Sequence, residues 1–243
     1  MHRLLTGASS GIGRALVTCW ARPGSLLSLQ GRDSSRLADV ADAARAAGAV
    51  VATASLDVRD TQALQAWILE RDDELPVDMV VANAGIAGNP GVTAADIMLV
   101  NAVGKIATVE PLLPRMQARQ RGHVVLVSSL ASFFASPTGP AYAASKAAVR
   151  LYGEGLRPRL ARDGVDLSVV CPGFVDTPLT RVNRFRMPFL MDAGKAAAII
   201  DAGLAARRAR ISFPLPTYML ARLTGMLPVA LRDAVLMRQP TKE

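Results

Sequence analysis

The chain has 243 residues, of which 51% are hydrophobic and 20% charged, and it carries a formal net charge of +8. This length accommodates one domain with a sizeable core, and no uncharged apolar run reaches the roughly eighteen residues that a membrane-spanning helix needs. The opening residues MHRLLTGASSG lack the basic, apolar and small-residue regions of a signal peptide, so we expect a single cytoplasmic domain over residues 1–243.

The positive charge is concentrated at the end of the chain. Residues 1–180 carry 17 basic and 16 acidic side chains, whereas residues 181–243 carry 11 and 4. A basic segment can bind nucleic acid or an anionic lipid surface. No zinc finger, helix-turn-helix spacing or basic run with interleaved aromatic residues accompanies this one, so no nucleic-acid partner is expected. Cys19, Cys171, His2 and His123 show no metal-ligand spacing, and we expect no metal site.

Short β-branched or leucine-rich runs alternate with longer alanine-rich segments of helical period. This alternation predicts an α/β fold: a doubly wound, Rossmann-type arrangement of three layers, in which helices cover both faces of a seven-stranded parallel sheet. The expected strands are residues 3–5, 26–30, 50–55, 79–82, 123–128, 166–171 and 210–213. The expected helices are residues 13–21, 34–47, 61–71, 93–121, 142–162 and 193–206.

Two segments of the second half depart from this rhythm. Residues 175–191 lack clear periodicity and contain Pro178 and Pro188, which indicates a long loop that serves as a substrate lid. Residues 215–238 are rich in Leu, Met and Ala, and their prolines divide them into two short apolar helices. Pro158 falls inside the expected helix 142–162 and should kink or shorten it.

A glycine-rich segment, T-G-A-S-S-G-I-G, follows the first strand and opens the first helix. Gly7, Gly11 and Gly13 permit a tight turn and let the backbone approach a pyrophosphate at the positive end of the helix. Glycine-rich turns also occur for purely structural reasons. The position of this one inside a strand-helix-strand unit favours a dinucleotide-binding loop.

The second expected strand ends at Gly31 and Arg32, where an NAD-binding protein would place an acidic residue for the adenosine 2′-hydroxyl. A guanidinium at this point suits a 2′-phosphate. We therefore expect NADP as the cofactor, with NAD as the second choice. The simpler interpretation is that Arg32 is a solvated loop residue.

Tyr142 and Lys146 are four residues apart and are therefore neighbours on one helix face. A free phenol has a pKa of about 10, too high for efficient proton exchange at neutral pH. An ammonium about 4 Å away would favour the phenolate by up to about 4 kcal/mol at an effective dielectric constant of about 20. The pair can serve as an acid/base device, although such a pair on its own usually marks a solvated helix face.

Further motifs stand in order around this pair. They are Asp57 followed by Val58, N-A-G at 83–85, Asn101, Ser129 thirteen residues before Tyr142, and P-G-x-V-x-T at 172–177. With them, the chain from about Arg3 to Thr180 resembles a classical short-chain dehydrogenase/reductase. The resemblance implies hydride transfer between NADP(H) and a ketone, an aldehyde or a secondary alcohol.

The resemblance also implies a role for each matching residue. Ser129 would hold the substrate oxygen while Tyr142 exchanges its proton. Lys146 would bind the nicotinamide ribose and lower the phenol pKa, and Asn101 would position a water that links Lys146 to solvent. The implied cofactor contacts are Gly7, Ser9, Ser10, Gly11, Ile12, Gly13, Arg32, Asp57, Val58, Asn83, Ala84, Gly85, Tyr142, Lys146, Pro172, Gly173, Val175 and Thr177. The implied substrate contacts are Ser129, Tyr142 and Phe174.

Simpler interpretations of some of these residues stay open. Ser128 adjoins Ser129 and offers the same hydroxyl, although the spacing to Tyr142 favours Ser129. Asp57 could cap the following turn instead of contacting the adenine. Val175 and Thr177 could end a strand rather than meet the nicotinamide carboxamide.

Substrate and assembly are less closely defined. The residues that make the loop after Pro172 apolar are Phe174, Leu179, Phe185, Met187, Phe189 and Leu190, and they predict a hydrophobic substrate or merely a well-packed lid. The resemblance implies a homodimer or homotetramer, and Pro158 places the tetramer in doubt.

Two other functions are considered. One is a lipid-metabolising reductase that touches a membrane surface weakly through the apolar segment 215–237 and its arginines, Arg222, Arg232 and Arg238. The other is a non-catalytic nucleotide-binding regulator on the same fold. The complete set of Asn101, Ser129, Tyr142 and Lys146 argues against the regulator.

Overall fold

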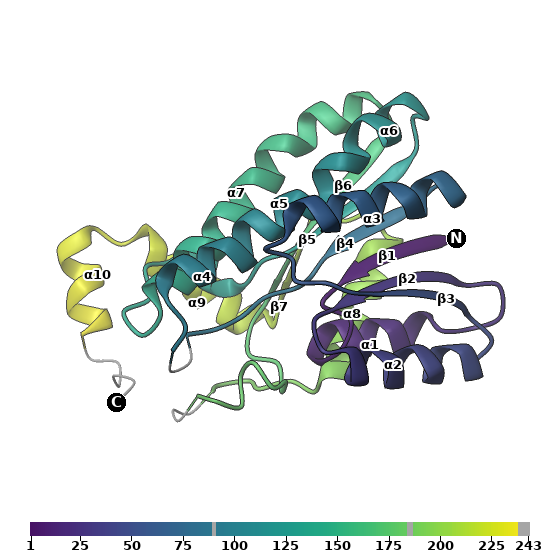
Figure 1. Cartoon of the computed structure of the whole chain (residues 1–243). Helices are drawn as coiled ribbons and strands as arrows, with labels where there is room; N and C mark the ends of the chain where they lie inside the picture. The colour runs from purple at the N-terminus through teal and green to yellow at the C-terminus, as the bar shows by residue number, and fades with distance from the viewer. Residues whose placement is uncertain (89–90, 184–186, 238–243) are drawn as a thin grey trace.

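The computed structural model describes residues 1–88, 91–183 and 187–237. Phe185 of the expected lid and Arg238 of the basic tail lie outside the described residues. The described chain forms one sheet with helices on both of its faces (Figure 1).

The sheet has seven strands in the order β3-β2-β1-β4-β5-β6-β7, and every neighbouring pair is parallel. The strands are β1 (His2–Thr6), β2 (Leu26–Gly31), β3 (Val50–Ser55), β4 (Met79–Ala82), β5 (Gly122–Val127), β6 (Val165–Pro172) and β7 (Arg210–Phe213). Strands β1 to β3 extend the sheet toward one edge, and β4 to β7 extend it toward the other. The carboxyl ends of β1 and β4, where this order changes, therefore flank a natural binding crevice. The predicted doubly wound α/β fold is confirmed.

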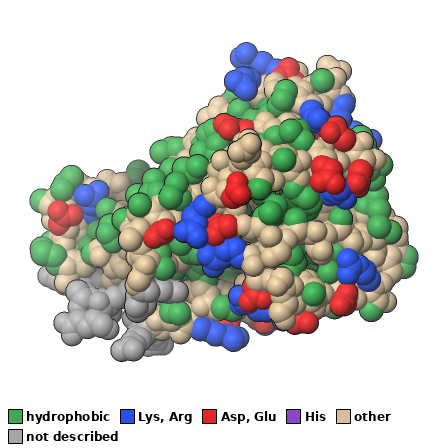
Figure 2. Space-filling model, viewed as in Figure 1, with side chains coloured by type: hydrophobic (Ala, Val, Ile, Leu, Met, Phe, Trp, Pro, Cys, Tyr) green, Lys and Arg blue, Asp and Glu red, His purple; other side chains and the backbone are tan. Residues whose placement is uncertain are grey.

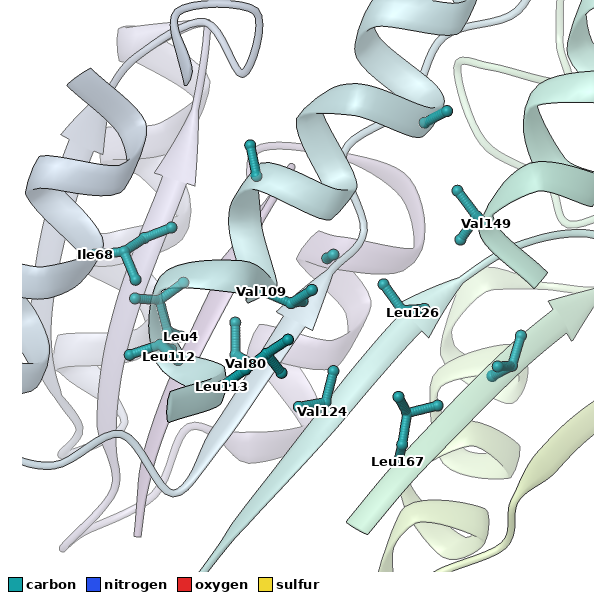
Figure 3. Close-up of a cluster of buried hydrophobic side chains, with 14 of the residues drawn as sticks. Leu4, Ile68, Val80, Val109, Leu112, Leu113, Val124, Leu126, Val149 and Leu167 are labelled. Carbon is teal, nitrogen blue, oxygen red and sulfur yellow. The ribbon is translucent and has the colours of Figure 1, made fainter. Parts of the chain in front are cut away.

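Alternation along the strands explains the two helical layers. Leu4 packs on the face covered by α3 (Thr61–Glu74) and α7 (Pro140–Arg162), and Figure 3 shows this cluster. The next residue, Leu5, packs on the opposite face, which is covered by α1 (Gly11–Trp20), α2 (Ser34–Ala46) and α8 (Ala193–Ala205). Successive side chains of a strand point to opposite faces, so strands covered on both sides consist of continuous apolar runs.

The long helix expected over residues 93–121 is broken into shorter pieces. They are α4 (Ala94–Met98), a π-helical turn (Leu99–Val103), α5 (Gly104–Val109), a 3₁₀ turn (Glu110–Leu112) and α6 (Leu113–Ala118). Pro111 has no N–H to donate, which favours the tighter turn there. The π turn contains Asn101, whose side chain is held by another segment. The stretch Ala94–Ala118 is long and apolar enough to cross a membrane, but 61% of its most apolar window is buried inside the protein, as in a core helix.

Pro158 does not shorten its helix. Helix α7 runs from Pro140 through Pro158 to Arg162, so the expected shortening is wrong. Pro158 is exposed, whereas Leu160 in the following turn is fully buried. Tertiary burial of the last turn outweighs the missing backbone donor. Homo-oligomerisation and the doubt that Pro158 raises about a tetramer both stay predictions.

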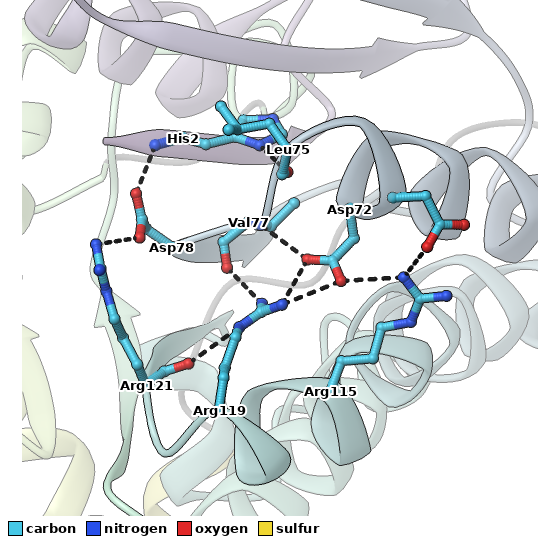
Figure 4. A network of polar contacts seen from close by, with 9 residues as sticks. His2, Asp72, Leu75, Val77, Asp78, Arg115, Arg119 and Arg121 are labelled. Carbon is cyan, nitrogen blue, oxygen red and sulfur yellow. Dashed lines mark hydrogen bonds and ion pairs between the residues drawn. The ribbon is translucent and has the colours of Figure 1, made fainter.

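A network of charges joins elements at the end of the sheet remote from the strands' carboxyl ends (Figure 4). Asp72 of α3, whose side chain is 3% exposed, accepts hydrogen bonds from Arg119 at 3.0 Å and from Arg115 at 3.2 Å, and it also accepts from the backbone N–H of Val77 at 2.8 Å. Asp78 accepts from Arg121 at 2.6 Å. The buried carboxylate is thus fully partnered, and the network stabilises the fold away from the cleft.

Candidate active site

The glycine segment forms the turn between β1 and α1. Gly7 and Gly11 have φ values of +68° and +55°, the left-handed region that glycine adopts readily. Gly13 lies so close to the turn that a Cβ atom there would stand 2.1 Å from the Gly7 carbonyl oxygen. This segment therefore requires glycine at three positions, and its open backbone faces the crevice at the carboxyl end of β1.

Asn83, directly after β4, holds the glycine turn in place. Its side-chain amide donates to the carbonyl oxygens of Thr6 and Gly7 at 3.1 and 3.0 Å, and its backbone N–H donates to the Thr6 hydroxyl at 3.2 Å. The amide can make these bonds because β1 and β4 are neighbours in the sheet. The N-A-G segment thus forms part of the crevice floor.

A cleft runs along the carboxyl ends of the strands. Every residue expected to contact the cofactor lines it, apart from Gly13, which lies against Gly7 behind the turn. Gln30, Gly31, Asp33, Arg36, Ile86, Val100, Val127, Ser128, Ser129, Pro178, Leu179 and Thr180 also line it. The cleft accordingly extends from β2 to the segment after β6.

Two arginines lie at the β2 end of this cleft. Arg32 is exposed, and Arg36 is held by Asp33, whose carboxylate caps α2 and lies 2.7 Å from the guanidinium. The Asp33 carboxylate is occupied by this cap and this ion pair. The two guanidinium groups give this end of the cleft the charge that a phosphate needs.

Asp57 lies at the same end, and its carboxylate is already engaged. It accepts from the Arg59 backbone N–H at 2.9 Å and pairs with the Arg59 guanidinium at 2.8 Å, which lowers the pKa of Asp57. The residue therefore caps its turn, as the simpler interpretation held, while also lining the cleft with Val58.

The two adjacent serines after β5 differ in their contacts. The Ser128 hydroxyl donates to the Lys146 carbonyl at 2.7 Å and is buried, so it is unavailable to a substrate. The Ser129 hydroxyl accepts from the Ala131 N–H at 3.1 Å and lies 3.5 Å from the Pro172 carbonyl. Ser129 faces the same space as Tyr142, so the geometry favours Ser129 over Ser128.

Tyr142 and Lys146 lie together on α7 at the floor of the cleft. The Lys146 ammonium is 5.4 Å from the centre of the Tyr142 ring and 3.4 Å from the Val127 carbonyl oxygen. Burial raises the pKa of the Tyr142 phenol, and a hydrogen bond from Ser129 opposes this rise. Burial also lowers the pKa of Lys146 to about 8. The phenol pKa is thus raised in this structure rather than depressed as expected, because burial outweighs the hydrogen bond from Ser129.

Asn101 is fully buried and does not line the cleft. Its side chain accepts from the Ile86 N–H at 2.8 Å and donates to the Ile86 carbonyl at 2.9 Å and to the Ser145 hydroxyl at 3.1 Å. A Cβ atom at Gly85 would lie 3.0 Å from the Asn101 oxygen and 3.4 Å from the Lys146 nitrogen. Asn101 thus lies behind Gly85 and beside Lys146, tying the segment after β4 to α7.

A second cavity, of about 650 Å³, adjoins the cleft and is mostly apolar. Ser129, Tyr142 and Gly173 line both spaces. Of the loop residues expected at the substrate, Phe174 and Leu179 line this cavity, whereas Met187, Phe189 and Leu190 do not. Phe189 and Leu190 are instead exposed.

The far wall of the apolar cavity comes from α9 (Leu215–Met226), which precedes α10 (Val229–Leu236). Leu220, Ala221 and Thr224 of α9 line the cavity. The helix is anchored by Tyr218, whose ring meets Phe133 edge-on at 5.4 Å, and by Gly225, where a Cβ atom would stand 1.9 Å from the Phe133 carbonyl oxygen. The C-terminal segment therefore shapes a binding space as well as covering the core.

Comparison with known proteins identifies the family. The model of the short chain dehydrogenase family matches residues 2–186. An uncharacterized oxidoreductase of Myxococcus xanthus is 39% identical over 242 residues, covering 97% of this chain and 96% of that protein. A ketoacyl reductase of Nostoc is 32% identical, covering 82% of this chain and 72% of that one. The chain belongs to the short-chain dehydrogenase/reductase family of oxidoreductases.

Solved structures agree with this assignment. A short-chain dehydrogenase from Sphingobium yanoikuyae in complex with NADPH superposes with a TM-score of 0.82 at 23% identity, covering 100% of this chain and 98% of that one. A family member from Burkholderia phymatum in complex with NAD has a TM-score of 0.81 at 27% identity, covering 100% and 97%. The fold of the whole described chain is therefore that of the family.

Sequence reasoning missed several residues at the site. Arg36 could have been found from its place in the first turn of the helix that follows Arg32. The α9 residues had no local signal, since their role depends on where the C-terminal segment packs. Lys105 is buried beside Lys146, and its only sequence signal is the scarcity of lysine in a chain with 28 basic residues.

Proposed function

We propose that this chain is an NADP(H)-dependent oxidoreductase that transfers a hydride between nicotinamide and a hydrophobic ketone, aldehyde or secondary alcohol. One observation carries the proposal: Ser129 and Tyr142 lie where the long cleft meets the apolar cavity. A carbonyl group in the apolar cavity would reach both hydroxyls while a dinucleotide occupied the cleft.

The cleft fits a dinucleotide by its chemistry. The turn lacks side chains at Gly7 and Gly11, which line the cleft, so its backbone can approach a pyrophosphate there. Two structural neighbours contain NADPH or NAD, which supports a nicotinamide cofactor but not a choice between them. The guanidinium groups of Arg32 and Arg36 support NADP, because each can pair with a 2′-phosphate.

The side chains supply proton transfer and orientation. When bound, the nicotinamide would give or accept the hydride. Ser129 would donate a hydrogen bond to the substrate oxygen, and Tyr142 would transfer a proton to or from that oxygen. The raised pKa of Tyr142 keeps the phenol protonated near neutral pH, which suits a proton donor in carbonyl reduction. Lys146 would hold the nicotinamide ribose and favour the phenolate after proton transfer.

Steady-state assays with NADPH and NADH over a panel of carbonyl compounds test this function. Bulky aryl or steroid-like ketones should be reduced, because the cavity that adjoins Tyr142 is large and apolar. The KM for NADPH should be at least about 10-fold lower than that for NADH, since two charge-assisted pairs would be lost without the phosphate. Equal or better use of NADH would remove the NADP assignment, and activity solely on small polar sugars would refute the substrate class.

Weak contact with a membrane surface is the second candidate, and the exposed C-terminal helices favour it. Leu215, Leu223, Met226 and Val229 are each more than half exposed. Figure 2 shows apolar side chains, with a few charged ones among them, at the α10 end of the molecule. Apolar residues beside basic ones suit an anionic lipid surface. Flotation with anionic liposomes should recover part of the protein at low salt, and complete absence from the lipid fraction would end this proposal.

A further inference from the structure

Lys105, the second residue of α5, is a buried cation that the proposed reaction does not use. Its exposed fraction is 0%, and it is the largest fully buried side chain of the described chain. Its nitrogen donates to three backbone carbonyl oxygens, those of Ala82 at 3.1 Å, Asn83 at 3.0 Å and Val127 at 2.7 Å. These carbonyls belong to the carboxyl ends of β4 and β5, directly beneath the cleft.

The three carbonyl oxygens favour the protonated form of Lys105. An ammonium has three N–H donors and no acceptor, so it satisfies three carbonyl oxygens at once. A neutral amine has two N–H groups and one lone pair, so it would donate to only two of the three carbonyl oxygens. Burial and the neighbouring Lys146 lower the pKa of Lys105. The three carbonyl dipoles oppose this effect, because they stabilise the charged form.

Lys146 shares one of these oxygens. The Val127 carbonyl accepts from Lys105 at 2.7 Å and from Lys146 at 3.4 Å, so the two nitrogens are neighbours across a single oxygen. Lys146 is 4% exposed, and burial lowers its pKa to about 8. The other titratable groups that face Lys146 are Tyr142 on its own helix and Cys171 on β6, whose pKa burial raises to about 11. The pair therefore consists of two lysine nitrogens that share one acceptor in a dry environment.

The composition makes this pair unusual. The chain has 28 basic residues, and only four of them are lysines: Lys105, Lys146, Lys195 and Lys242. Two of these four are buried side by side. Lysine can release its proton when buried, whereas arginine remains charged.

We propose that Lys105 is a positioning residue of the active site: its ammonium ties the carboxyl ends of β4 and β5 beneath Lys146, and its charge makes Lys146 release a proton more readily. The proposal rests on the proposed function, in which Lys146 assists Tyr142. Once Tyr142 has given its proton to the substrate oxygen, Lys146 can return one to the phenolate, and solvent can reprotonate Lys146. A second cation beside Lys146 favours that return.

A neutral Lys105 would have the opposite effect on the pKa of Lys146. If Lys105 were the neutral partner, its lone pair would accept a hydrogen bond from Lys146 and hold the proton on Lys146. Removal of Lys105 would then lower the pKa of Lys146. If Lys105 is protonated, its removal should instead raise the pKa of Lys146.

Lysine-specific ¹³Cε labelling and an NMR pH titration of the full chain test the proposal, since only four lysines contribute signals. In the wild-type protein Lys146 should lose its proton at a lower pH than Lys105, because the three carbonyl oxygens hold the proton on Lys105. In Lys105→Met the midpoint of Lys146 should rise by about one pH unit or more, because a neighbouring charge is removed. Lys195→Arg is the matched control: Lys195 is exposed, so the change should leave both buried midpoints in place and assign its own signal.

Three outcomes overturn the proposal: Lys105 deprotonates before Lys146 in the wild type, or the Lys146 midpoint stays in place or falls in Lys105→Met. The first of these is decided even if Lys105→Met fails to fold. In the reduction assay of Lys105→Met, the decline of kcat at high pH should shift to higher pH together with the Lys146 midpoint. A purely structural role of Lys105 would lower kcat and leave the pH of this decline unchanged. The NMR midpoints need no substrate, so a failed carbonyl assay beside the expected midpoints would refute the proposed function alone.

Discussion

Replacing Tyr142 with phenylalanine is expected to lower kcat for carbonyl reduction by about 100- to 10,000-fold, the range that a positioned general acid contributes. The change removes one hydroxyl at the junction of the cleft and the apolar cavity and leaves the ring, so NADPH binding should change little. Stopped-flow or steady-state rates together with an NADPH fluorescence titration measure the two effects separately.

Tyr152→Phe serves as the control for this change. Tyr152 lies on the same helix but lines neither the cleft nor the apolar cavity, so its hydroxyl should be dispensable for turnover. Retention of normal kcat in Tyr142→Phe would show that another group donates the proton and would overturn the assigned mechanism. Loss of NADPH binding in that variant would mean that the hydroxyl has a structural role instead.

A single methyl group at Gly13 is expected to weaken NADPH binding by about 100-fold or more. The new Cβ would stand 2.1 Å from the Gly7 carbonyl oxygen and 2.7 Å from the Asn83 amide nitrogen, so the glycine turn must move. Displacement of a binding segment by about 1 Å can cost two orders of magnitude. Crowding should also lower the free energy of unfolding by about 1–3 kcal/mol. NADPH titration and chemical denaturation of Gly13→Ala measure both quantities.

Gly155→Ala is the matched glycine variant. Gly155 lies on α7 and is exposed, and a Cβ atom added there would meet no heavy atom within 4 Å. Alanine should therefore raise the free energy of unfolding by about 0.5–1 kcal/mol and leave NADPH binding unchanged. Wild-type affinity in Gly13→Ala would contradict the assignment of the glycine turn to the dinucleotide.

Local patterns predicted the sheet because its strands are buried on both faces. Val80 and Val81 are adjacent in β4 and belong to opposite clusters, so the whole run must be apolar whichever way each side chain points. The glycine turn is equally local, since Gly7 and Gly13 must lack side chains for the turn to close at all. Both features can be recognised from a few consecutive residues.

Contacts between distant segments escaped prediction. The break in the helix over residues 94–118 includes a turn at Asn101, whose amide is held by the Ile86 backbone fifteen residues earlier. Nothing in the helical period of that stretch encodes the contact. The same holds for Leu220, which reaches the apolar cavity only because α9 packs against the segment that contains Phe133.

The sequence by itself determined the sheet, the glycine turn and the family to which the chain belongs, because each depends on residue types at short, ordered spacings. The tertiary structure decided that Ser129 rather than Ser128 faces the apolar cavity, that burial raises the pKa of Tyr142, and that Lys105 lies beside Lys146. Proton affinity and side-chain availability depend on water exclusion and on partners brought from remote strands, and only the folded chain supplies both.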